Sequence, residues 1–256
     1  MVTLNEIIAE YGLSKLNTAT KYPSILTYHA MGDRGSLQRD VNAGVDFGGV
    51  SVIVTEKVDG TNARIIFDES GDFILGSREE LIYAKNDRVW PEKQPILREL
   101  LNEKLPCTVS ALPNTGITVL FGEVYGEKIN SGYTKSRGFL IFDAMRLDTK
   151  VLALPNSELA FRRENGGQAF LPFDELDGFA AMAPKVPTLH AESASVEPPP
   201  LALEDAYEYM RKWMPTSRIP ETARPEGIVV RTPDRSIIRK LRYQDYERTF
   251  KKMKGM

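Results

Sequence analysis

The chain has 256 residues, of which 42% are hydrophobic and 27% charged, a composition typical of a globular protein with a substantial core. Its one cysteine, Cys107, excludes an internal disulfide and a multi-cysteine zinc site, and it suits a reducing compartment. We find no long apolar run and no basic leader before an apolar stretch, so we expect a cytoplasmic protein without a membrane segment.

The net charge of −2 conceals an uneven distribution. Residues 207–256 carry 13 Lys and Arg against 6 Asp and Glu, which is +7, and the rest of the chain carries −9. A basic end could meet a polyanion such as nucleic acid, or it could be a solvated helix face. Charge alone favours the solvated face.

The N-terminal part of the chain predicts one helix and one extended segment. Apolar residues of 4–11 recur at helical spacing and indicate a short amphipathic helix, with Thr3 or Asn5 as its N-cap. Residues 22–29 read as extended, and 32–49 as a loop rich in glycine and charge. His29 has no second ligand at metal spacing, so we expect it to be structural.

Residues 52–67 organise the rest of the chain. Two β-branched runs flank a short polar turn, which predicts strand, loop and strand. The turn carries Lys57, Asp59 and Asn62, with Gly60 permitting a close approach. A lysine held against a low-dielectric sheet loses its proton more readily than a solvated one, and neutral lysine is a nucleophile. Taken alone, the stretch favours a surface hairpin with a solvated lysine.

The remaining elements alternate between strands and helices. A hairpin joins 65–67 to 73–75 and leads to Ser77 and Arg78. The further predictions are a helix over 79–105, strands at 119–126 and 137–143, a short helix at 172–179, an exposed loop at 191–200, a helix at 203–213, strands at 226–231 and 236–242, and a basic helix at 244–254. We expect one domain, because the last strands are too few to build a core of their own.

The predicted strand ends present side chains with a shared chemical logic. One lysine could attack a phosphorus, an aromatic ring could stack on a base, carboxylates could bind a ribose hydroxyl and a divalent metal, and cations could hold phosphates. The set is Lys57, Arg78, Glu123, Phe142, Glu226, Lys240 and Arg242.

The order of these strings resembles the covalent nucleotidyltransferase superfamily of ATP-dependent ligases and capping enzymes. Glu56-Lys57-Val58-Asp59-Gly60-Thr61-Asn62 resembles motif I and points to the RNA ligase 2-like family. The later strings resemble motifs Ia, III, IIIa, IV and V; they are Ser77-Arg78, Phe121-Gly122-Glu123-Val124-Tyr125-Gly126, Phe139-Leu140-Ile141-Phe142-Asp143, Glu226-Gly227-Ile228-Val229-Val230 and Lys240-Leu241-Arg242.

The resemblance implies an α+β fold in which antiparallel sheets form an ATP-grasp-like nucleotidyltransferase (adenylyltransferase) domain with flanking helices. We expect this single domain to span residues 1–256, without a C-terminal OB-fold, because the chain stops 14 residues after Arg242. The implied activity is that of an ATP-dependent RNA ligase. Such an enzyme forms a lysyl-AMP, transfers the AMP to a 5′-phosphate end and joins that end to a 3′-hydroxyl, as in RNA repair.

The resemblance also implies roles for individual residues. Lys57 would be the nucleophile, Lys240 and Arg242 would neutralise the α-phosphate, Asn62 would support the phosphate side, and Glu226 would bind the metal. The implied nucleotide-binding residues are Glu56 beside the adenine edge, Asp59, Gly60, Arg78, Glu123 on the ribose, Phe142 stacked on adenine, Lys240 and Arg242.

The implied cofactors are ATP, with AMP as the covalent intermediate, and Mg²⁺ or Mn²⁺. The implied partners are RNA ends, including a nicked duplex, and an accessory protein, with the enzyme itself a monomer and no membrane involved. Two positions depart from the family: Arg242 replaces a usual lysine, and Asp59 replaces a frequent histidine. A DNA ligase or an mRNA-capping guanylyltransferase therefore remains an alternative, as does a non-catalytic nucleic-acid-binding module of the same fold.

Overall fold

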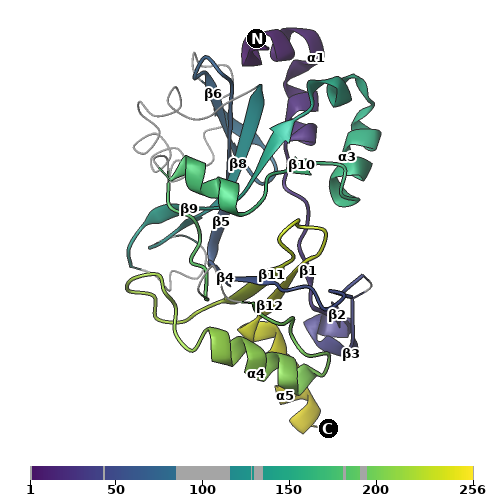
Figure 1. Cartoon of the computed structure of the whole chain (residues 1–256), viewed down its shortest axis with the longest axis vertical. Helices are drawn as coiled ribbons and strands as arrows, with labels where there is room; N and C mark the ends of the chain where they lie inside the picture. Colours follow the sequence, from purple (N-terminus) through teal and green to yellow (C-terminus); the bar gives the residue numbers. More distant parts are fainter. Residues whose placement is uncertain are drawn as a thin grey trace. The chain divides into compact units, whose positions relative to one another are not determined.

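The structure is a computed structural model that describes residues 2–42, 44–84, 116–127, 129, 135–180, 183–190 and 195–255 (Figure 1). It confirms an α+β fold with antiparallel sheets. Internal contacts divide the chain into two compact units. Unit 1 comprises Met1–Ser24, Gly60–Asn130 and Arg137–Lys185, and unit 2 comprises Ile25–Asp59, Ser131–Ser136 and Val186–Met256.

The described part of unit 1 is built on a six-stranded sheet in the order β10-β9-β8-β5-β6-β7, with every neighbouring pair antiparallel. Its strands are β5 (Gly60–Phe67), β6 (Phe73–Ser77), β7 (Leu81–Ala84), β8 (Ile117–Tyr125), β9 (Gly138–Leu147) and β10 (Ala169–Phe170). Phe67 pairs with Phe73, which confirms the predicted hairpin. The central strands β5 and β8 are almost wholly buried, so the sheet forms the core of this unit.

Two α-helices of unit 1 contact each other, α1 (Leu4–Ala19) and α3 (Asn156–Glu164) (Figure 1). Thr3 is the N-cap of α1: its hydroxyl accepts from the Glu6 N–H at 3.2 Å, and the Glu6 carboxylate accepts from the Thr3 N–H at 2.8 Å. The helix runs past its predicted end because Gly12, with φ of 79°, kinks it without stopping it. Short 3₁₀ turns, η3 (Thr149–Ala153) and η4 (Asp174–Phe179), complete the unit.

Unit 2 contains a four-stranded sheet in the order β1-β12-β11-β4. Its strands are β1 (Leu26–Thr27), β4 (Ile53–Lys57), β11 (Gly227–Arg231) and β12 (Ile238–Arg242). The pair β1 and β12 is parallel, and the other two pairs are antiparallel. Beside the sheet lie the hairpin of β2 (His29–Met31) and β3 (Leu37–Val41), the turn η1 (Asp33–Gly35), and the helices α4 (Leu203–Trp213) and α5 (Tyr243–Lys254). None of the helices in the described residues has the length and apolar character needed to cross a membrane.

The sheet of unit 2 has two faces, because side chains alternate along each strand. One is a core face; the other, called the open face, carries both partly exposed side chains and buried ones such as Thr55. Val54, Ile228, Val230 and Leu241 pack with buried residues of α4 and α5. The pairing register places Lys57, Gly227 and Arg242 in one row across the three strands β4, β11 and β12, on the opposite face. The row formed by Thr55, Val229 and Lys240 lies on that same open face.

Two predicted segments differ from the structure. Within the predicted helix 79–105, residues 81–84 form β7, and residues 85–105 lie outside the described residues. Pairing with β6 and burial of Leu81 and Ile82 outweigh local helix propensity there. Within the predicted loop 32–49, residues 37–41 form β3. The side chain of Leu37 is buried, and its backbone N–H donates to Thr249 Oγ1 at 2.8 Å, so contacts with the rest of unit 2 hold this segment in place.

The long connection after β9 is more ordered than predicted. It contains α3, which the sequence analysis missed, and η4, which matches the expected short helix at 172–179. Part of the predicted exposed loop 191–200 is buried, since Val196 is 3% exposed and its carbonyl accepts from the Val52 N–H at 2.8 Å. His29 is structural, as expected: its ring nitrogens lie 2.8 Å from the Tyr246 hydroxyl and 2.9 Å from the Leu201 carbonyl.

Two adjacent valines on β11 allow a test of which face of the sheet packs against the core. Val230 is fully buried, whereas Val229 lies partly exposed on the open face. We expect Val230→Ala to lower the free energy of unfolding by about 2 kcal/mol, and Val229→Ala by less than about 1 kcal/mol. Denaturant titration measures both values, and equal losses would contradict the assignment of the faces.

Candidate functional site

The open face of unit 2 holds a lysine–carboxylate pair. Lys57 ends β4, and its Nζ lies 2.8 Å from Oε2 of Glu226, the residue before β11. The two side chains are 23% and 15% exposed, so the pair is largely shielded but still open to a ligand. Antiparallel pairing of β4 with β11 holds the two residues together, since Gly227 is the register partner of Lys57.

The environment of Glu226 shifts the pKa of its carboxyl in two opposing directions. Burial raises the pKa of its carboxyl above the usual range, and the negative charge of Asp59 adds to the rise. The charge and hydrogen bond of Lys57, and the charge of Arg242, act in the opposite direction.

Gly227 leaves the middle of the row without a side chain. A Cβ at this position would collide with the backbone carbonyl of Leu241, so the strand pairing requires glycine here. Lys57 and Arg242 therefore lie on either side of Gly227 in one row, and Lys240 lies on the same face two residues before Arg242. Three cations on one face suit the oxygens of a phosphate.

The buried carboxylate of Asp245 orients Arg242. Arg242 Nε donates to Oδ2 at 2.7 Å and Nη2 to Oδ1 at 3.1 Å, and Asp245 is 1% exposed in the first turn of α5. This two-point contact uses the planar fork of arginine, which lysine lacks. Asp245 is not among the residues predicted from the sequence; its signal is an acid three residues after a cation at a strand-to-helix junction.

Glu56 lies on the core face, opposite Lys57. Its carboxylate accepts hydrogen bonds from Ser217 Oγ and from the Arg218 N–H, the latter at 2.8 Å. Burial raises the pKa of the Glu56 carboxyl, against these hydrogen bonds. Because neighbouring residues of a strand point to opposite faces, the side chain turns away from Lys57. The predicted contact of Glu56 with the adenine edge stays a prediction, and its carboxylate holds Ser217 and Arg218 beside β4.

Unit 1 carries a second group of the predicted residues, on β5 and β8. Asn62 and Glu123 are register partners, and both are partly exposed. Asn62 Oδ1 is shielded from solvent and has no hydrogen-bond partner among the described residues. A Cβ at Gly60 would collide with the Val124 carbonyl and crowd Glu123 Cγ, so only glycine lets β5 begin this close to β8.

Phe142 sits at a bulge in β9, because Phe121 pairs with Asp143 and Gly122 with Ile141. Its ring meets the ring of Tyr22 edge-on, with centroids 5.0 Å apart, and it remains partly exposed. The Tyr22 hydroxyl donates to Asp143 Oδ2 at 2.9 Å, so Tyr22 is held rigidly behind Phe142. Tyr22 is not among the residues predicted from the sequence, because the carboxylate that holds its hydroxyl lies 121 positions away in the chain.

Arg78 follows β6 and is 56% exposed, with Nη2 3.0 Å from Ser24 Oγ. The structure therefore gathers the predicted residues into two groups. The unit 2 group is Lys57, Asp59, Glu226, Lys240 and Arg242, and the unit 1 group is Gly60, Asn62, Arg78, Glu123 and Phe142.

Comparison with known proteins identifies the class. The family model described as RNA ligase matches residues 50–253. This range includes every residue of both groups. The chain belongs to the RNA ligase family. No curated protein sequence matches the chain.

The fold is similar to solved RNA ligase structures from Naegleria gruberi. A lysine-to-alanine variant with ATP and Mn has a TM-score of 0.53 and 13% identity, covering 90% of this chain and 64% of that one. The same ligase with PPi has a TM-score of 0.53 and 15% identity over the same shares. The chain thus spans less than two thirds of the length of these ligases.

The electrostatics of Glu226 can be tested by titration. We expect the carboxyl resonance of Glu226 to titrate above the usual range for glutamate, as followed by ¹³C NMR. Lys57→Met should raise this pKa further, because it removes the nearest positive charge, and Asp59→Asn should lower it. Shifts of the same sign in both variants would contradict the arrangement.

Proposed function

We propose that this member of the RNA ligase family is an ATP-dependent RNA ligase that works through a covalent lysyl-AMP at Lys57. The observation that carries the proposal is the Lys57–Glu226 contact at 2.8 Å, on a sheet face that also presents Lys240 and Arg242. This set provides a nucleophile, a proton acceptor and cations for a phosphate on one rigid surface.

In the first step Lys57 attacks the α-phosphorus of ATP. Its ammonium first gives a proton to Glu226 Oε2, the carboxylate oxygen 2.8 Å away, and burial of Glu226 favours that transfer. The nitrogen lone pair then forms the N–P bond, and the bond from the α-phosphorus to the bridging oxygen breaks, so its electron pair leaves with pyrophosphate. Lys240 and Arg242 stabilise the negative charge that develops on the α-phosphate oxygens.

Two further displacements complete the proposed reaction. An oxygen of the RNA 5′-phosphate attacks the phosphorus of lysyl-AMP, the P–N bond breaks, and Lys57 regains a proton. The RNA then carries AMP through a 5′–5′ pyrophosphate. The 3′-hydroxyl oxygen attacks the 5′-phosphate phosphorus and loses its proton, AMP departs with the P–O electron pair, and a phosphodiester remains.

The unit 1 group would bind the nucleoside part of ATP. Glu123 would accept hydrogen bonds from the ribose hydroxyls, and Phe142, backed by Tyr22, would stack on adenine. Stacking of a base on an aromatic ring contributes about 1–3 kcal/mol. Among the described residues Asn62 Oδ1 is shielded from solvent without a hydrogen-bond partner, and this supports the proposal that a ligand binds at this end of the sheet. The similar ligase structures with ATP or AMP and Mn support nucleotide and metal use.

The donor set fits a divalent metal bound together with the nucleotide. Among the described residues no three His, Cys, Asp or Glu side chains gather to hold a metal, but Asp59 lies close enough to Glu226 to raise its pKa. Mg²⁺ and Mn²⁺ are commonly held by one or two carboxylates plus substrate phosphates. Glu226 would hold the metal while it is ionised, with Asp59 beside it. Once Glu226 carries the proton from Lys57, Asp59 and the substrate phosphates would hold the metal. When bound, the metal would neutralise phosphate charge.

Two alternatives remain distinguishable by assay. A DNA ligase or a capping guanylyltransferase would use the same lysine, and a non-catalytic nucleic-acid-binding module would form no adduct. The family match favours RNA as the substrate. The cytoplasmic location, single domain, monomeric state, accessory protein and repair role stay predictions.

The lysyl-AMP can be tested by labelling. We expect incubation with α-labelled ATP and Mg²⁺ or Mn²⁺ to give a covalent protein–AMP adduct that is labile to acid, as a P–N bond is. Lys57→Ala should abolish the adduct, whereas Lys150→Ala, at an exposed lysine of η3, should retain it. An adduct that survives in Lys57→Ala would refute the role of Lys57.

Substrate choice can be tested on nicked duplexes. We expect faster sealing when the strand bearing the 3′-hydroxyl is RNA than when it is DNA, and labelling by ATP but not by GTP. Equal sealing of DNA nicks would favour a DNA ligase, and labelling by GTP would favour a guanylyltransferase.

A further inference from the structure

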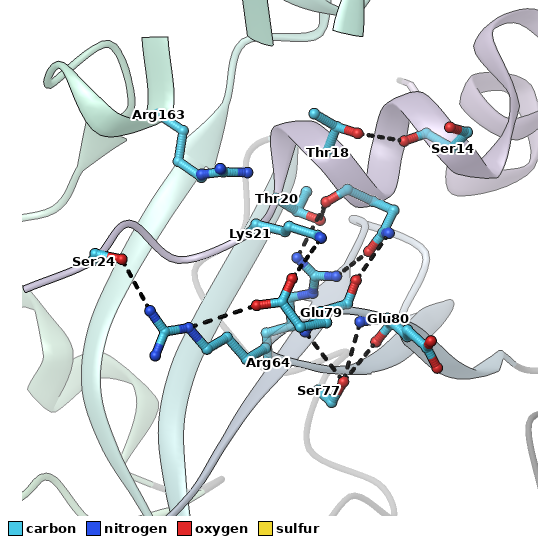
Figure 2. A network of polar contacts seen from close by, with 12 residues as sticks. Ser14, Thr18, Thr20, Lys21, Ser24, Arg64, Ser77, Glu79, Glu80 and Arg163 are labelled. Atoms are coloured by element: carbon cyan, nitrogen blue, oxygen red, sulfur yellow. Dashed lines mark hydrogen bonds and ion pairs between the residues drawn. The ribbon is translucent and has the colours of Figure 1, made fainter. Parts of the chain in front are cut away.

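Four cationic side chains from four separate segments of unit 1 act on one carboxylate, that of Glu79, and two of them contact it (Figure 2). They form the cation cluster, made up of Lys21 after α1, Arg64 on β5, Arg78 after β6 and Arg163 on α3. Lys21 Nζ lies 2.8 Å from Glu79 Oε2, and Arg78 Nε lies 3.8 Å from Oε1. The hydrogen bond from Lys21, and then the charges of Lys21, Arg78 and Arg163, lower the pKa of Glu79.

Positive charge exceeds negative charge in this cluster. Arg163 contacts a second carboxylate, Glu164, at 2.7 Å, so four cations share two acids. Arg64 is fully buried, and its guanidinium donates to the Asn17 carbonyl at 3.2 Å and to Asn17 Oδ1. Burial lowers the pKa of Arg64 to about 9, so it remains charged at neutral pH. Cations held this close repel one another, and an anionic ligand would relieve the repulsion.

The cation cluster is open to solvent on one side. Glu79 and Arg78 are 68% and 56% exposed, whereas Lys21 and Arg163 are 24% and 19% exposed. The exposed side chains of Glu79 and Arg78 can therefore move, whereas those of Lys21 and Arg163 are largely shielded from solvent. Asn17 Nδ2 donates to the Glu79 backbone carbonyl at 3.1 Å, so this backbone stays in place when the carboxylate swings out.

The cluster adjoins the unit 1 site residues. Ser77, the residue before Arg78, pairs with Ala63, and the preceding residue Asn62 pairs with Glu123. Lys21 directly precedes Tyr22, whose ring backs Phe142. An RNA strand whose end reaches Asn62, Glu123 and Phe142 therefore passes next to the cation cluster.

We propose that the cation cluster binds backbone phosphates of the RNA substrate, and that Glu79 occupies the phosphate position until RNA displaces it. The inference rests on the proposed function, since RNA is the polyanion that such a ligase must hold. Arginine forks match phosphate oxygens in two-point contacts, and lysine adds a point charge. Lys21 and Arg163 are thus RNA-binding residues, and Glu79 is an internal competitor that weakens non-productive binding.

The test measures binding of a 5′-phosphorylated nicked RNA duplex without ATP, as a function of salt. We expect Lys21→Gln and Arg163→Gln each to weaken binding roughly two- to fivefold. Each should also reduce the slope of log affinity against log salt by about one, because one phosphate contact is lost.

Lys150→Gln and Arg162→Gln are matched controls. Lys150 lies in η3, and Arg162 Nη2 lies 3.4 Å from the Gly167 carbonyl rather than beside Glu79. Both should behave as the unaltered protein.

Glu79→Gln provides a test of opposite sign. The amide keeps an acceptor oxygen for Lys21 but removes the competing charge, so RNA should bind more tightly, by roughly two- to fivefold. A merely structural role for Glu79 predicts weaker or unchanged binding, and either result would overturn the proposal.

Labelling of Lys57 by ATP in the absence of RNA separates this inference from the proposed function. We expect Lys21→Gln, Arg163→Gln and Glu79→Gln to label as the unaltered protein does. A raised ATP requirement in these variants would mean that the cluster serves nucleotide phosphates instead, and would overturn the RNA assignment. If the unaltered protein does not label while RNA binding follows the expected pattern, the proposed function fails and the RNA-binding surface stands.

Discussion

The pairing of β4 with β11 is the constraint on which the candidate chemistry depends. It brings Lys57 within 2.8 Å of Glu226, although 169 positions separate them in the chain. Backbone hydrogen bonds set this distance, so the two side chains meet without an added ordering cost when a ligand arrives. The adjacent pairing with β12 adds Arg242 and Lys240 to the same face, and glycine at 227 permits the close approach of the β12 backbone.

Much of the fold could be predicted from local patterns. The hairpin of β5 and β6, the helices α4 and α5, and the strands β11 and β12 were predicted because their apolar periods and turns are encoded locally. The strands β3 and β7 were missed because each is stabilised by its partner strand and not by its own composition. Val196 was predicted to be exposed from its polar, proline-rich neighbours, yet its contacts with the core come from distant residues.

The candidate site shows the same division. The motifs identified the residues that could touch a nucleotide, but not the side chains that hold those residues in place. Asp245 and Tyr22 acquire their roles through contacts with Arg242 and Phe142 that appear only after folding. The resemblance to motif I implies that Glu56 lies beside the adenine edge, and this stays a prediction. Strand alternation puts its side chain on the face opposite Lys57, where its carboxylate accepts hydrogen bonds from Ser217 and Arg218.

The Asp245–Arg242 contact also ties the open face of unit 2 to a group of aromatic rings. Asp245 lies between Tyr243 and Tyr246, and Tyr246 is fully buried against Tyr207 and His29. An anion that engages Arg242 must share the guanidinium with Asp245, and so alters the electric field at the start of α5. Tyrosine absorbs in the near ultraviolet, and its spectrum depends on the local electric field. The near-ultraviolet spectrum of the tyrosines around that turn would therefore change when an anion binds Arg242, without any attached dye.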